Sequence, residues 1–227
     1  MNTHTRHNFH FEKPAIIVGG GHVDEEYLTK LLANGYSLIA ADGGANRFYK
    51  SDIIPDVIIG DMDSLDNISH WRTKTALLEI DEQESTDFEK CLALTNAPLY
   101  VGLGLIGKRF DHSLATMHAM ARFATKKTVV LLDETDVIFA ARGHVKLTLE
   151  KGARISIYPF GKINFESSRG LKYPLDNLVM EQGVQIGTSN EAISDVIEIT
   201  PSNAYATYNV IVAKRFIDNI ITAGLAG

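Results

Sequence analysis

The sequence is poor in the features of secreted and membrane proteins. Cys91 is the only cysteine among 227 residues, so no intramolecular disulfide can form, and a reducing cytoplasm is the expected setting. No apolar run approaches the roughly 20 residues that a membrane-spanning helix needs. The polar segment Met1–Lys13 lacks the apolar stretch of a signal peptide. We expect it to be a disordered arm, although His4, His7 and His10 carry metal-ligand nitrogens.

Long runs of lysine and arginine are also missing, and the formal net charge is −6. This balance argues against non-specific binding to nucleic acid or to a membrane surface. It suits an enzyme that holds an anionic substrate through a divalent cation. No Gly-x-x-x-x-Gly-Lys-Ser/Thr segment occurs, so the chain is not a P-loop kinase.

Residues 14–135 alternate short apolar runs with helical patterns, which predicts a doubly wound α/β domain with a parallel sheet. The apolar runs predict strands that are buried on both faces. They are Ala15–Val18, Ser37–Ala41, Val57–Ile59, Ala76–Ile80, Leu99–Leu103 and Thr128–Leu132. Helices are predicted over Asp24–Asn34, over Thr86–Thr95 with a capping box of Thr86 and Glu89, and over Asp111–Lys126. The last carries Leu114, Met117, His118 and Ala121 along one stripe.

Residues 136–227 show the alternation of half-buried strands, with turn residues between them. The expected strands are Lys146–Glu150, Arg154–Pro159, Asp195–Ile199 and Ala206–Val212. Gly187–Glu191 reads as a polar loop. We therefore predict a second domain, an antiparallel β-sandwich.

The predicted parallel strands all end in acidic or glycine-rich segments, and ligands bind at that edge of such a sheet. Asp61 and Asp63 follow Gly60 at a strand end, and two carboxylates at this spacing can face one Mg²⁺ ion. Asp42 precedes Gly43 and Gly44, where the backbone can approach a ligand closely. A turn aspartate explains Asp42 equally well.

Other loops on this edge point to phosphate. Gly104, Gly107 and Arg109 resemble a phosphate loop, because glycines expose N–H groups and arginine offers a fork for phosphate oxygens. Gly19, Gly20 and Gly21 read as a turn. Asp87 in a helical first turn is explained by the helix dipole alone. For Asp111 and His112, a helix cap followed by a partly buried histidine and a functional role are equally good explanations.

The ordered motifs resemble those of the thiamine pyrophosphokinase family, from about Pro14 to Val212. They are Ala41-Asp42-Gly43-Gly44-Ala45-Asn46, Pro55-Asp56, Gly60-Asp61-Met62-Asp63-Ser64, Ser85-Thr86-Asp87-Phe88-Glu89-Lys90, Gly107-Lys108-Arg109-Phe110-Asp111-His112 and Gly187-Thr188-Ser189-Asn190-Glu191. The resemblance implies an α/β ATP-binding domain, a β-sandwich, and a homodimer in which thiamine lies between one chain's α/β domain and the partner's sandwich.

The resemblance also implies roles for individual residues. The expected metal and diphosphate-transfer site comprises Asp42, Asp61, Asp63 and Asp87; the expected ATP site comprises Gly43, Gln83, Thr86, Gly107, Arg109, Asp111 and His112; Ser189 and Asn190 are expected on the thiamine side. The chain departs from the family pattern at Met62, Glu84, Lys108 and Thr116.

The implied reaction is in-line attack of the thiamine hydroxyl on the β-phosphorus of ATP, with release of AMP and with Mg²⁺ as cofactor. Asp63 or Asp87 would accept the hydroxyl proton. Two alternatives stay open: a diphosphotransferase that acts on another alcohol, and a non-catalytic sensor of thiamine diphosphate or nucleotide.

Overall fold

The computed structural model describes residues 9–226, which form two compact units that divide between Ala119 and Met120. His4 and His7 of the expected arm lie outside the described residues. The described part of the arm, residues 9–13, is not disordered as expected, because β1 (Phe9–His10) pairs in parallel with β6 (Thr95–Asn96). None of the helices within residues 9–226 combines the length and the apolar character that crossing a bilayer requires.

The first unit is built on a parallel sheet, as five of the six predicted runs indicate. Its strands, in the order in which they pair, are β7 (Tyr100–Leu103), β2 (Ala15–Val18), β3 (Ser37–Ala41), β4 (Val57–Gly60) and β5 (Ala76–Glu79). Four of these strands are buried except at Ser37, the first residue of β3, but β5 is at least partly exposed along its length. The prediction of burial on both faces is therefore wrong for β5, because this strand lies at the edge of the sheet and has one neighbour, β4. The sixth run, Thr128–Leu132, was wrongly predicted to lie in this unit: its strand, Val129–Leu132, belongs to the second unit, where it pairs antiparallel with Asp136–Arg142 because the two are joined by a short turn.

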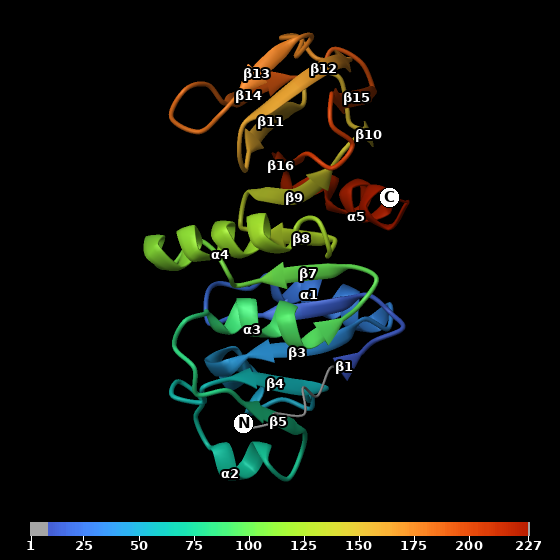
Figure 1. Cartoon of the computed structure of the whole chain (residues 1–227). Coiled ribbons are helices and arrows are strands. Elements are labelled where there is room, and N and C mark those ends of the chain that lie inside the picture. The colour runs from blue at the N-terminus through green and yellow to red at the C-terminus, as the bar shows by residue number, and fades with distance from the viewer. Residues whose placement is uncertain (1–8, 227) are drawn as a thin grey trace. The chain divides into compact units, whose positions relative to one another are not determined.

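Two helices of the first unit begin at side-chain caps, one of which was predicted. In α1 (Glu25–Ala33), Asp24 caps the first turn by accepting from Tyr27 N, and Leu28 and Leu31 are buried. The capping box at α3 (Asp87–Leu94) is confirmed, and this helix packs against β3 and β4 (Figure 1). Two short helices were not predicted, η1 (Asp42–Phe48) and α2 (Ile68–Trp71).

The longest helix, α4 (Phe110–Phe123), buries a different stripe from the predicted one. Thr116, Ala119 and Met120 are buried, whereas Leu114 is 55% exposed and His118 is exposed. The buried stripe includes the polar residue Thr116, so a prediction based only on the spacing of apolar residues assigns the wrong face of the helix to the core.

The second unit consists of antiparallel strands, again in agreement with the sequence pattern. One set pairs in the order β14 (Gly187–Glu191), β11 (Arg154–Pro159), β16 (Thr207–Ala213), β9 (Asp136–Arg142) and β8 (Val129–Leu132). The other pairs in the order β10 (Val145–Thr148), β15 (Val196–Pro201), β12 (Ile163–Arg169) and β13 (Leu178–Met180). Gly187–Glu191 is thus a strand and not the expected loop, because its backbone pairs with β11 despite its polar side chains.

Apolar side chains join the two sets of strands in the second unit. The rings of Phe165 on β12 and Tyr208 on β16 pack edge to face, with centroids 5.3 Å apart, and both residues are completely buried. The short η2 (Lys214–Phe216) leads into α5 (Ile217–Ala226), which packs against β8, β9 and β10.

Candidate active site

The loops that follow the parallel strands surround a cleft of about 530 Å³ in the first unit. Most of the predicted catalytic and ATP-site residues line it: Asp42, Gly43, Asp61, Gln83, Thr86, Asp87, Arg109 and His112. Asp63, Gly107 and Asp111 lie on the same loops but are not among the residues that line the cleft. Ser189 and Asn190 belong to the second unit.

Asp42 is the most deeply buried acidic group of this cleft. It directly follows β3, has a left-handed φ of 41° and is 2% exposed. Its Oδ2 accepts a hydrogen bond from Ser64 N at 3.0 Å, whereas its Oδ1 has no hydrogen-bond partner among the described residues. Burial raises the pKa of Asp42 to about 6, with a smaller contribution from the charge of Asp87.

Gly60, the last residue of β4, lets two acidic side chains come close together. A Cβ atom at this position would lie 2.6 Å from the Cβ of Asp42 and 3.1 Å from Oδ1 of Asp87. Both distances are shorter than ordinary van der Waals contacts. Only glycine therefore fits between Asp42 and Asp87 without displacing one of them.

The Asp61-Met62-Asp63 turn presents two further carboxylates. Met62 has a φ of 63°, and Asp63 N donates back to Asp61 Oδ1 at 3.2 Å. Gln83 Nε2 donates to Asp61 Oδ2 at 2.8 Å, and this hydrogen bond is the main reason that the pKa of Asp61 lies below its usual range. Ser64 Oγ donates to Asp63 Oδ1 at 2.8 Å. The local contacts thus keep the Asp61 carboxylate ionised and fix its direction.

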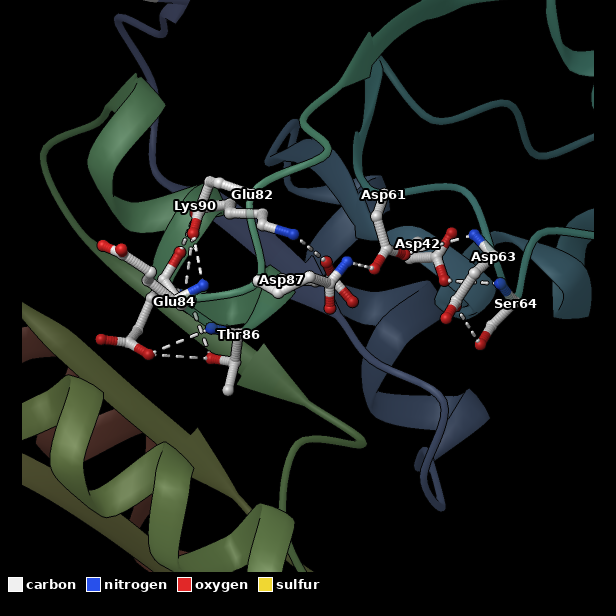
Figure 2. A network of polar contacts seen from close by, with 12 residues as sticks. Asp42, Asp61, Asp63, Ser64, Glu82, Glu84, Thr86, Asp87 and Lys90 are labelled. Atoms are coloured by element: carbon white, nitrogen blue, oxygen red, sulfur yellow. Dashed lines mark hydrogen bonds and ion pairs between the residues drawn. The ribbon is translucent and has the colours of Figure 1, made fainter.

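Carboxylate oxygens of Asp42, Asp61 and Asp63 all lie within 4.8 Å of one another. Figure 2 shows these three side chains close together, with Asp87 beside them. A set of carboxylate oxygens suits a hard cation such as Mg²⁺. The unpartnered, buried Oδ1 of Asp42 fits the same interpretation, because a buried charge without a partner is costly unless a cation compensates for it.

Asp87 lies beside this cluster without belonging to it, and is paired with a lysine. It opens α3, and its Oδ1 lies 3.3 Å from Lys90 Nζ, one turn further along. Burial raises the pKa of Asp87, while the positive charge of Lys90 opposes the rise. The Lys90 side chain is only 3% exposed, whereas the Asp87 side chain is 32% exposed, so the ion pair is shielded from solvent on its lysine side.

The glycine-rich segment after β2 is packed against the loop after β7. A Cβ atom on either Gly19 or Gly21 would lie 2.6 Å from the carbonyl oxygen of Gly104, and Gly21 N donates to that oxygen at 2.8 Å. Gly104 itself has a φ of +65°. The two loops can contact each other through their backbones only because these residues are glycines. The prediction of an isolated turn at Gly19–Gly21 did not include this contact.

In the expected phosphate loop, Arg109 is held by a neighbouring carboxylate. Its Nε and one terminal nitrogen donate to the two oxygens of Asp111 at 3.1 and 2.6 Å, and both side chains are well exposed. Gly107 N donates to Ser113 Oγ at 3.1 Å. Asp111 thus orients the guanidinium, which lines the cleft.

Several residues that support the site were missed as functional by sequence reasoning. Asn46 donates to Ser64 O and accepts from Asp66 N, both at 2.8 Å, so it braces the loop that carries Asp63. Arg47 joins η1 to Gly21 O at 2.8 Å. The family motif that contains Asn46 was the available signal for it, whereas nothing in the pattern singles out Arg47.

The loop around Glu84 is also held by side chains that were not predicted. Glu82 accepts from the backbone N–H groups of Glu84 and Ser85 at 2.8 and 3.1 Å, and from the Ser85 hydroxyl. Thr116, one of the departures from the family pattern, donates to Leu105 O at 2.9 Å and lines the cleft. Glu84 and Lys108, which also differ from the family pattern, line the cleft as well.

Ser189 and Asn190 lie on β14 and differ in their surroundings. Ser189 is exposed and has a φ of 58°, and its N–H donates to Ser156 Oγ. Asn190 is 5% exposed, and its side chain is bonded to both the N–H and the carbonyl of Tyr173, at 3.1 and 2.7 Å. Asn190 therefore fixes the segment around Tyr173, and Ser189 presents its side chain to solvent.

Two family models match this chain. Residues 28–132 match the family described as thiamin pyrophosphokinase, catalytic domain, and residues 144–205 match thiamin pyrophosphokinase, vitamin B1 binding domain. The chain is 30% identical over 185 residues to thiamin pyrophosphokinase 1 of Caenorhabditis elegans, an alignment that covers 73% of this chain and 75% of the relative. It is 29% identical over 196 residues to thiamine pyrophosphokinase 1 of Oryza sativa subsp. japonica, which covers 71% and 74%.

Solved structures with the same fold carry the same description. Thiamin pyrophosphokinase from Candida albicans superposes with a TM-score of 0.76 at 17% identity, over 94% of this chain and 95% of that one. Thiamine pyrophosphokinase from Bacillus subtilis gives a TM-score of 0.72 at 22% identity, over 88% and 99%. At these identities the likeness concerns the fold, and it confirms the predicted mixed α/β architecture.

Proposed function

The chain belongs to the thiamine pyrophosphokinase family, and on that premise we propose that it transfers the diphosphate group of ATP to the hydroxyl of thiamine, forming thiamine diphosphate and AMP. The observation that carries the proposal is the cluster of Asp42, Asp61 and Asp63 oxygens within 4.8 Å at the strand-end cleft. Diphosphate transfer needs positioning and compensation of negative charge more than it needs a covalent partner.

We assign the metal to this cluster and propose that it is Mg²⁺. When bound, the cation would neutralise charge on the phosphate oxygens. Asp61 is kept ionised by Gln83, and Asp42 contributes its buried free oxygen. We assign the phosphate chain of ATP to the side of the cleft that is lined by Arg109, because its fork matches phosphate oxygens. Gly43, Thr86 and His112 line the same cleft, and Gly107 and Asp111 support Arg109.

We assign acceptance of the thiamine hydroxyl proton to Asp87. This carboxylate lines the cleft, whereas Asp63 is not among its lining residues. Asp87 is also outside the cluster of three, so its oxygens are not needed by the cation. Lys90 holds one oxygen of Asp87 in place and leaves the other for a proton.

We further propose that residues 14–135 act as the α/β ATP domain and that residues 136–227 form a β-sandwich that binds thiamine. The two family models, which end at 132 and begin at 144, support this division. The lone, buried Cys91 is in keeping with a reducing cytoplasm.

The thiamine site, in this proposal, is completed across a homodimer by Ser189 and Asn190. Ser189 presents an exposed side chain, and Asn190 holds its neighbourhood rigid. A mixed dimer tests this arrangement. One chain carries Asp63→Asn and the other carries Ser189→Trp, so a shared site leaves one of the two sites free of both lesions. Activity should return when the inactive homodimers exchange subunits. No recovery despite demonstrated exchange would mean that the site lies within one chain or that Ser189 is not part of it.

The decisive experiment for the reaction uses purified protein, ATP, Mg²⁺ and thiamine, with separate detection of AMP and thiamine diphosphate. Equal amounts of both products are expected. AMP formed only with another alcohol would favour a related diphosphotransferase. Binding of thiamine diphosphate without any turnover would favour a sensor.

A further inference from the structure

A second cleft, of about 690 Å³, lies wholly in the second unit and has a different character. Its ionisable lining residues are Lys126, Lys127, Arg142, His144 and Lys146, with Tyr205 beside them. None of the described residues that line it is an aspartate or a glutamate. Acidic residues outnumber basic ones in this chain, 28 to 22, so a cleft with cations alone is not what its average composition would give.

Arg142, the last residue of β9, is held in a defined position at this cleft. One of its terminal nitrogens donates to Thr125 O at 3.1 Å, and its guanidinium carbon lies 5.0 Å from the centre of the Tyr205 ring. Arg142 forms no ion pair with a carboxylate anywhere in residues 9–226. Its charge is therefore uncompensated, and most of its five N–H donors remain for a ligand.

The neighbouring cations differ in how far they are already compensated. Lys126 is exposed, and its ammonium group makes no hydrogen bond or ion pair within the described part of the chain. Lys146 pairs with Glu198 at 3.3 Å, and His144 Nδ1 shares a hydrogen bond with Thr200 Oγ1 at 2.9 Å. Arg142 and Lys126 are thus the two groups with free charge.

The backbone next to Arg142 is held in place by contacts of Gly143. Gly143, between β9 and β10, has a φ of +61°, and a Cβ atom there would lie 2.5 Å from the carbonyl oxygen of Ala204. The buried Tyr208 hydroxyl donates to Gly143 O at 2.9 Å. These contacts keep the end of the hairpin against the segment that carries Tyr205, so the cleft does not depend on a ligand for its shape.

We propose that this cleft is a second anion site, which binds the phosphate or diphosphate group of a small phosphorylated molecule. Arg142 supplies the planar fork and Lys126 a point charge, and the Tyr205 ring offers an apolar face to the organic part of the ligand. The volume lies within the range of small-molecule pockets, roughly 300–1,000 Å³, and a concave site suits a small ligand better than an extended polyanion. The site is separate from the acidic cleft and needs no metal, so it does not depend on the proposed reaction.

The test measures binding of inorganic diphosphate to the full chain by calorimetry, with EDTA present so that a metal-dependent site contributes nothing. We expect binding with one ligand per chain. Arg142→Gln and Lys126→Gln should each weaken it about tenfold, because each removes a charge-assisted contact. Lys151→Gln is the matched control: it removes the same charge from an exposed turn of the second unit, outside the cleft, and should change affinity less than twofold.

AMP is the second probe and separates the two possible sources of the anion. If an organic phosphate is the natural ligand, AMP should bind more tightly than inorganic phosphate, and Tyr205→Leu should abolish that advantage while binding of diphosphate stays unchanged. Equal affinities for AMP and phosphate would support an inorganic anion as the ligand of the same site.

Three outcomes would overturn the proposal: no metal-free binding of diphosphate, an equal loss with Lys151→Gln, or binding of a single-stranded DNA oligomer where diphosphate does not bind. Since Arg142 also bonds to Thr125 O, thermal unfolding of each variant is measured in parallel. Lys126→Gln removes no contact of the fold and remains informative if Arg142→Gln is unstable.

Discussion

The two clefts of this chain are suited to phosphate chemistry in opposite ways. The first unit gathers Asp42, Asp61 and Asp63 at strand ends, where, in the proposed function, a cation would stand between protein and phosphate. The second unit has cations at the end of a hairpin, and these can meet an anion directly. The acidic cleft also has backbone in the left-handed region at Asp42 and Met62, whereas Arg142 is exposed on ordinary strand backbone.

The two clefts should differ in their effect on the stability of the folded protein. Aspartate has a short side chain, so three carboxylates meet only if the backbone itself brings them together, with burial and strain as consequences. Lysine and arginine have long side chains and keep their charges in water while they reach into a cleft. The acidic site should therefore lower the stability of the metal-free protein, and the basic site should not.

The largest expected effect tests whether the acidic cluster is required. Asp61→Asn and Asp63→Asn should each lower AMP formation in the presence of Mg²⁺ and thiamine by about 1,000-fold, since each removes a metal ligand from the transition state, where several kcal/mol are at stake. Asp66→Asn is the control, because it lies on the same loop and its carboxylate makes no hydrogen bond or ion pair within residues 9–226. Near-normal turnover of either cluster variant would remove that residue from the metal site.

The stability cost of the acidic site is tested by Asp42→Asn in metal-free buffer. The pKa of Asp42 is about 6 in the folded protein against 3.8 for a free group, so the folded state loses stability as pH rises from 3.8 to 6 and keeps the penalty above 6. Removing the charge should stabilise the protein by at most about 3 kcal/mol at pH 8 and by nothing near pH 3.

The readout is urea unfolding at both pH values, with activity measured alongside. A variant that is no more stable than the native protein at pH 8 would contradict the idea that the acidic site carries an uncompensated charge. The same comparison with Arg142→Gln should show no gain, because its charge is exposed.

Gly60→Ala probes the close approach of Asp42 and Asp87. The added methyl group would meet both side chains, and a displacement of reacting groups by about 1 Å costs on the order of 100-fold in rate. Overpacking should also destabilise the fold by roughly 1–3 kcal/mol. Gly161→Ala in the second unit serves as control, because no atom lies within 4 Å of its added Cβ. Unchanged kinetics in Gly60→Ala would show that the spacing of the two carboxylates is not critical.

The smallest effect is expected at Arg109. Arg109→Lys keeps the charge but loses the fork that Asp111 orients, so KM for ATP should rise about tenfold with little change in melting temperature. Asp111→Asn should raise KM less, because the guanidinium remains. If Arg109→Lys instead lowers stability and leaves KM unchanged, Arg109 is a structural residue.

By itself, the sequence determined the strands of the first unit and the loops that carry its acidic residues. Ala15–Val18 and Ser37–Ala41 are strands with the predicted bounds, and the capping box of Thr86 and Glu89 is present. Apolar runs and capping residues act over a few positions, so their signal survives without knowledge of the fold. The ordered motifs were likewise enough for the family, since their residue types and order need no coordinates.

Only the tertiary structure decided which of these groups meet. Gly60 lies against Asp42 and Asp87, Gly104 against Gly19 and Gly21, and Gln83 against Asp61, although long stretches of chain separate them. The polar segment Gly187–Glu191 became a strand because β11 satisfied its backbone, and the cations of Lys126 and Arg142 came to one cleft through the ends of different elements. Such contacts arise from the packing of distant segments, and a pattern that is read along the chain does not contain them.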